Sequence, residues 1–92
     1  IIMIIKMKDE IDRELHKLTD WLHDYLLQIF HLIDTKLLSE KEVSDLNDLR
    51  VSIETDLHCQ NVELLSGLVE SAKELIEELS QKVYDQAEKL LK

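Results

Sequence analysis

Hydrophobic residues in the first third of the chain recur at intervals of three and four. From Ile11 the steps are 4, 3, 4, 3, 4 and 3, through Leu15, Leu18, Leu22, Tyr25, Ile29 and Leu32. This heptad rhythm is typical of a helix that packs against other helices. Further apolar residues beside the row widen it into the broad stripe of a bundle helix. The pattern predicts a first helix at about 6–38.

The rhythm breaks at LLSEKEV, residues 37–43, where Ser39 and Glu42 have the spacing of a capping box. In this motif the serine oxygen accepts a hydrogen bond from the amide three residues on, and the glutamate reaches back to the serine amide. We therefore expect a turn at about 38–41. A second apolar stripe follows and predicts a helix at about 41–91. Polar Gln60 and Asn61 take stripe positions, which indicates a possible break at 58–61.

Two all-α architectures fit this pattern within a single domain, residues 1–92. Proline is absent and glycine occurs once, so turn signals are few. A continuous second helix makes an antiparallel helical hairpin that overruns the first helix by about 28 Å. A bend at 58–61 makes a three-helix bundle. We favour the hairpin because no glycine or proline marks the bend, and we expect self-association, with a dimer favoured, to complete a larger helical bundle.

Charge and composition restrict the partners and the location. The chain has 20 acidic and 11 basic side chains, a formal charge of −9. Such a chain repels phosphate backbones, so we exclude direct nucleic-acid binding and expect a protein partner of basic character. The apolar run IIMIIKMK is too short to cross a bilayer and lacks the features of a signal peptide. With the lone Cys59, this favours a cytoplasmic protein without membrane contact.

The segment HKLTDWLHDYLLQIFHLID, residues 16–34, holds three of the four histidines. His16, Asp20 and His23 have i, i+4 and i+7 spacing and are weak candidates for metal ligands. Helical geometry places them opposite the apolar stripe, whereas a metal site in a bundle needs ligands that project inward from facing helices. We therefore expect a solvated face, with no metal and no cofactor.

Catalysis is not expected, because two or three amphipathic helices of this size enclose little cavity. The chain also lacks a glycine-rich phosphate loop, a nucleophile elbow and an HExxH motif, so no catalytic residue is assigned. The prediction is a small acidic interaction module, an adaptor, regulator or inhibitor that acts through oligomerisation and partner docking. The apolar residues expected at its interfaces are Ile4, Trp21, Tyr25, Leu26, Phe30, Leu37, Leu64, Leu68, Leu75 and Leu79.

Two alternatives remain. An acidic face comprises Asp56, Glu63, Glu70, Glu74 and Glu77. Carboxylates on a rigid helix can imitate a phosphate backbone, which suggests an inhibitor of a nucleic-acid-binding protein. Residues 84–88 read YDQAE, a Y-x-x-x-E that resembles the secretion signal of the small helical-hairpin substrates of type VII secretion. That resemblance implies a secretion substrate or its partner, although the W-x-G of that family is absent and the turn reads LSEKEV.

Overall fold

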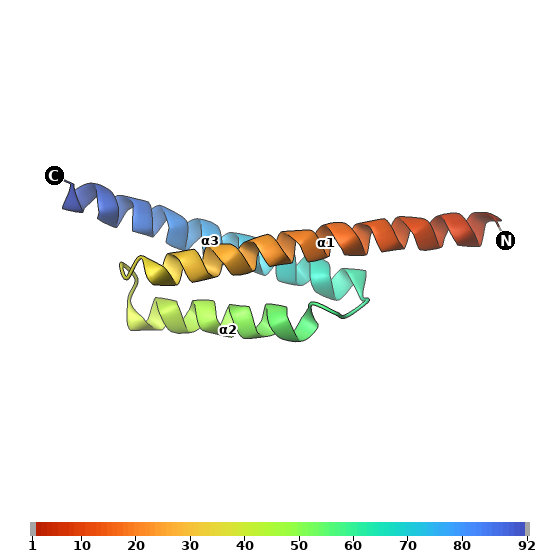
Figure 1. The fold of residues 1–92 in the computed structure, drawn as a ribbon, viewed down its shortest axis with the longest axis horizontal. Coiled ribbons are helices and arrows are strands. Elements are labelled where there is room, and N and C mark those ends of the chain that lie inside the picture. The colour runs from red at the N-terminus through yellow and green to blue at the C-terminus, as the bar shows by residue number, and fades with distance from the viewer. Residues whose placement is uncertain (1, 92) are drawn as a thin grey trace.

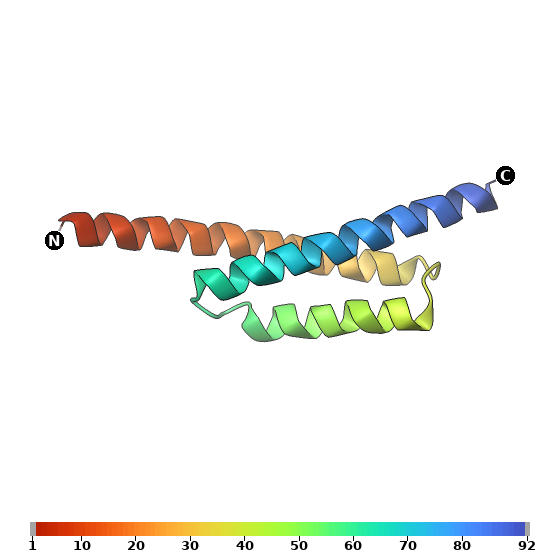
Figure 2. The same cartoon turned by 180° about the vertical axis from the view of Figure 1, so that it is seen from behind.

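In the part of the chain that the structure describes, there are three helices: α1 (Ile2–Asp34), α2 (Glu40–Asp56) and α3 (Val62–Leu90). The structure is a computed structural model that describes residues 2–91, apart from the side chains of Ile2 and Ile5. α1 and α3 run in the same direction and α2 runs opposite to both (Figures 1 and 2). Each helix contacts the other two. The molecule is elongated, with extents of 64 × 23 × 16 Å. The all-α prediction is confirmed.

The core lies along the centre of the three helices and is built from the predicted stripes. α1 contributes Leu18, Leu22, Ile29 and Leu32, and each of these side chains is buried. The other helices bury apolar residues at helical spacing against them: Leu46, Leu49, Ile53, Leu65, Val69, Ala72, Ile76 and Leu79. The stripe therefore fixes which face of each helix packs inward.

The first turn begins earlier than predicted, because α1 ends at Asp34 instead of at about residue 38. The Thr35 and Lys36 amides donate to the Leu32 and Ile33 carbonyls, and Lys36 adopts a left-handed conformation with φ of 58°. This conformation ends the helix and reverses the chain. The predicted capping box is confirmed: Ser39 Oγ accepts from the Glu42 amide at 3.2 Å, and Glu42 Oε1 accepts from the Ser39 amide at 2.9 Å.

The preferred hairpin was wrong, because residues 41–91 do not form one helix. α2 ends at Asp56 and α3 begins at Val62. Asn61 has an extended conformation and its side chain accepts from the Leu64 amide at 3.1 Å, which makes it the N-cap of α3. The break lets α3 fold back and bury its stripe within the same chain. Neither glycine nor proline is needed, since an asparagine cap satisfies the first turn.

Candidate functional site

The first turns of α1 extend beyond the rest of the molecule. They run past the α2–α3 loop and the beginning of α3 (Figures 1 and 2). We call residues 2–10 the overhang, about 13 Å of helix at 1.5 Å per residue. Ile4 and Met7 are 70% and 59% exposed there, and Ile11 at its base is 47% exposed. These apolar side chains lack the cover that α3 gives to the later turns of α1.

The exposed residues of the overhang continue the buried seam of α1. Ile4 and Ile11 are seven residues apart, and Leu18, buried in the core, is seven residues further on. Residues at this spacing lie on nearly the same side of a helix. The side of α1 that packs on the other helices is therefore the side that the overhang exposes, so a helix placed there would extend the bundle.

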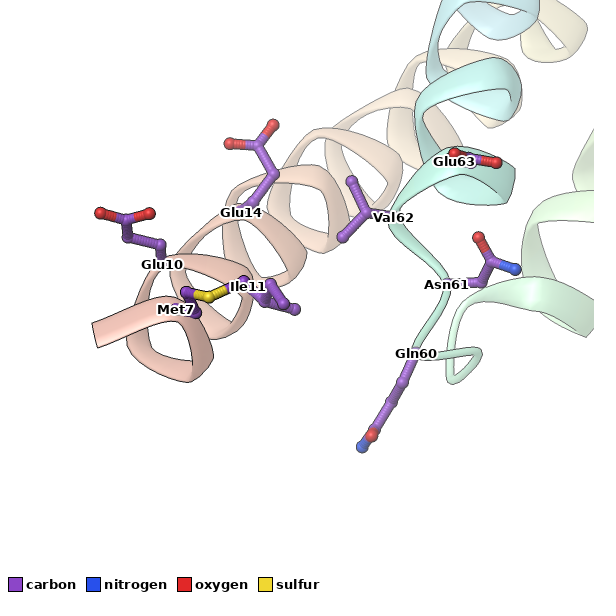
Figure 3. A pocket seen from close by; sticks show the side chains of 8 residues that line it. All are labelled: Met7, Glu10, Ile11, Glu14, Gln60, Asn61, Val62 and Glu63. Carbon is purple, nitrogen blue, oxygen red and sulfur yellow. The ribbon is translucent and has the colours of Figure 1, made fainter. Parts of the chain in front are cut away.

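A notch of about 710 Å³ lies where the overhang meets the start of α3 (Figure 3). Its apolar residues are Met7, Ile11 and Val62, and Val62 points from the first turn of α3 toward α1. Three carboxylates belong to the same lining, from Glu10, Glu14 and Glu63. Gln60 and Asn61 of the α2–α3 loop complete it. The notch therefore combines an apolar floor with negative charge.

A smaller groove of about 320 Å³ continues from the notch between α1 and α3, and Glu14 lines both. Trp21 and Tyr25 lie on its α1 side, and Trp21 is 44% exposed. Lys17 Nζ lies 4.8 Å from the centroid of the Trp21 ring, a cation–π contact. The other lining residues are Leu18, Ser66, Val69, Glu70 and Lys73. The tertiary structure thus places Trp21 and Tyr25 beside part of the acidic face.

The acidic face is divided between separate surroundings. Glu63 lines the notch and Glu70 lines the groove. Glu70, Glu74 and Glu77 surround a hollow on the surface of α3, but Lys73 lies among them. Asp56 is half-buried at the end of α2. The predicted row of carboxylates is therefore interrupted by one positive charge.

The remaining predicted interface residues differ in exposure. Phe30 and Leu64 are exposed on α1 and α3. Leu79 belongs to the monomer core and is only 3% exposed, so it is not accessible to a second chain in this fold. The half-buried members of the set, packed at the edge of the core or in the first turn, are Leu26, Leu37, Leu68 and Leu75.

The three histidines of residues 16–34 face solvent, on the side of α1 opposite the buried stripe, as helical geometry predicted. His16, Asp20 and His23 are all exposed, and His16 Nε2 lies 3.5 Å from Asp20 Oδ2. Across residues 2–91, histidine, cysteine and carboxylate side chains form no group of three that could hold a metal ion. The sequence pattern therefore brings one pair together and leaves His23 apart from it.

One site was not anticipated from the sequence, namely the notch, whose lining includes part of the α2–α3 loop. Glu10, Glu14 and Val62 were not among the predicted interface residues. Val62 becomes a neighbour of the two glutamates only when α3 folds back on α1. One feature of the sequence did indicate where α3 begins beside the notch. The apolar stripe is interrupted at Gln60 and Asn61 and resumes directly with VELL.

The chain matches no known protein family, and no curated protein or solved structure shows significant similarity to it. Within the part of the chain that the structure describes, none of the helices combines the length and the apolar character that crossing a membrane requires. Any assignment of function therefore depends on the surface of the molecule itself.

Proposed function

We propose that this protein is a small, acidic, non-enzymatic interaction module of the cytoplasm that self-associates and docks a protein partner. The observation that supports it is the exposed apolar seam of the overhang, Ile4, Met7 and Ile11. These side chains are contiguous along one side of a helix and are not isolated surface residues. Contiguous exposed apolar residues of this kind mark protein interaction sites.

The free energy available from covering this seam is large for so small a protein. Full burial of an isoleucine or methionine side chain contributes about 1.5–3 kcal/mol relative to leaving it in water. Three such side chains on each of two copies can offset much of the loss of translational and rotational freedom on association, an estimated ~4–15 kcal/mol. Covering the seam therefore favours self-association.

Sedimentation velocity over a range of concentrations tests this proposal. We expect the mass to rise from that of one chain to that of two. Ile4→Asp and Ile11→Asp should each raise the dimer dissociation constant by at least about tenfold, because each dimer loses two buried side chains. Leu27→Asp is the matched control, since Leu27 is 69% exposed but lies on the polar side of α1 beside Gln28 and His31. A wild-type protein that stays a monomer at high concentration contradicts self-association.

A second candidate function is inhibition of a nucleic-acid-binding protein by charge mimicry, favoured by the exposed carboxylates of Glu63, Glu70 and Glu77. These recur every seven residues along α3, which holds them on a rigid helix. Reversal of the charge at all three positions should abolish competition with DNA for a basic DNA-binding protein. Unchanged competition by the reversed variant contradicts this function.

A further inference from the structure

We infer that the occupant of the notch is the overhang of a second copy, in a symmetric dimer whose two α1 helices cross antiparallel. This inference rests on the proposed self-association and specifies its surface. A symmetric dimer buries the same patch on both copies, so the patch must be complementary to itself. The overhang and the notch overlap on α1, since Met7 and Glu10 belong to both, so that one contact can bury the same patch on each copy.

The first two turns of α1, before Asp9, have a charge opposite to that of the notch, whereas the overhang as a whole also carries Asp9 and Glu10. Residues 1–8 contain Lys6 and Lys8 and no acidic residue, and both lysines are exposed. The notch carries Glu10, Glu14 and Glu63. When these first two turns lie in the notch of another copy, Lys6 and Lys8 approach its three carboxylates, which favours this pairing over orientations that keep them apart.

The apolar side chains match in the same arrangement. When two α1 helices lie antiparallel with their centres near Asp9, Met7 of each copy lies opposite Ile11 of the other. Ile4 then lies opposite Glu14 at the edge of the other copy's notch, one helical turn from its Ile11. Lys6 lies within reach of the other copy's Glu10 and Glu14. One register thus brings Met7 and Ile11 of the two copies together and places the lysines near the carboxylates of the notch.

The other exposed end of the molecule is a poorer occupant. α3 extends past the α1–α2 turn and exposes Leu90 and Leu91 (Figure 1). Its charges are mixed, however, with Asp85 and Glu88 beside Lys89. Pairing of this end with the notch is also heterologous, which produces open chains of molecules instead of a closed dimer.

Disulfide trapping tests the register directly. The native cysteine is first removed as Cys59→Ser, and Met7→Cys and Ile11→Cys are then made in separate full-length chains that differ in mass by isotope labelling. Under mild oxidation the mixed pair should form a Met7→Cys to Ile11→Cys disulfide, because opposed seam residues come within the distance a disulfide spans. Met7→Cys mixed with Leu90→Cys is the matched control and should form little mixed product.

Charge exchange gives a second readout that does not depend on a cysteine. Lys6→Glu with Lys8→Glu should raise the dimer dissociation constant by about tenfold, since each symmetric contact then opposes like charges. Glu10→Lys with Glu14→Lys should do the same, and the chain that carries all four substitutions should recover most of the wild-type affinity. Circular dichroism confirms that helical content is unchanged in each variant.

The outcomes separate this inference from the proposed function. A dimer that yields the residue 7 to 11 disulfide and recovers on charge exchange supports both. A dimer that lacks this disulfide, or that links residue 7 to residue 90, overturns the antiparallel arrangement and leaves self-association in place. A protein that remains a monomer, or that places only a foreign basic helix in the notch, overturns the dimer itself.

Discussion

At the scale of the residue, Glu42 has two structural roles at once. Its Oε1 completes the capping box with Ser39, and its Oε2 accepts from Lys82 Nζ of α3 at 2.5 Å. The hydrogen bond from Lys82, followed by the one from the Ser39 amide, lowers the pKa of Glu42 from 4.5 to about 2. One carboxylate therefore fixes the start of α2 and links it to α3.

This pKa predicts how stability changes with pH. Because the folded state lowers the pKa, ionised Glu42 stabilises the fold above about pH 4.5, and this contribution is lost as the pH falls toward 2. Glu42→Gln should be less stable than wild type at pH 7, and the difference should shrink between about pH 5 and 2. Urea unfolding at successive pH values measures it, with Glu40→Gln on the same turn as the control. A difference that does not vary with pH contradicts the assignment.

Gly67 is a second residue with a local effect, since it lies inside α3 at an exposed position. A Cβ atom added there meets no atom within 4 Å. Gly67→Ala should therefore stabilise the protein by about 1 kcal/mol through the higher helix propensity of alanine. The urea midpoint should rise with an unchanged slope. A lower midpoint shows that the position needs glycine for a reason other than helix formation.

At the scale of the element, the junction between α2 and α3 decides the architecture. The Cys59 amide donates to the Asp56 carbonyl at 2.9 Å, and Asn61 then caps α3. The loop permits α3 to run parallel to α1 and to bury five residues against it and α2. The gain from that burial exceeds the loss of a few helical hydrogen bonds at 57–61.

The cap at Asn61 gives a prediction for this junction. Asn61→Ala should destabilise the protein by about 1 kcal/mol, because the Leu64 amide loses its acceptor. Asn61→Asp keeps an acceptor oxygen and should remain close to wild type. Urea unfolding of the two variants compares them directly. Equal stability of both variants indicates that the cap contributes little, and that the burial of the apolar side of α3 is sufficient to keep α2 and α3 as separate helices.

At the scale of the whole molecule, staggered helix ends produce the exposed surface. α1 and α3 are parallel but displaced, so α1 projects at one end and α3 at the other (Figure 2). The displacement leaves Ile4, Met7 and Ile11 without cover while the seam behind them is buried. The proposed association through this end stabilises the folded chain, so folding stability should depend on protein concentration.

The coupling is measurable as a melting temperature that depends on protein concentration. A dimer is stabilised by mass action, so the wild-type melting temperature should rise with each tenfold increase in concentration. For the Ile11→Asp variant, this rise should begin only at concentrations at least about tenfold higher. Differential scanning calorimetry measures both proteins. A wild-type melting temperature that is independent of concentration contradicts association of the folded chain.

Local signals in the sequence were sufficient for the all-α class and for the inner faces of the helices. Apolar spacing identified the buried sides of the helices, and the capping box at Ser39 and Glu42 located the start of α2. The helical geometry of the sequence also placed His16, Asp20 and His23 on the solvent side of the first helix. These features depend on residues three or four positions apart, so the sequence alone contains them.

Only the tertiary structure decided the break before α3 and the notch beside Val62. Whether residues 57–61 continue a helix depends on the burial that α3 gains against α1, which lies some 50 residues earlier in the chain. Apolar spacing is the same for a hairpin and for a three-helix bundle. The sequence by itself therefore determined helices with known inner faces, and the packing of distant segments determined which part of those faces remained uncovered.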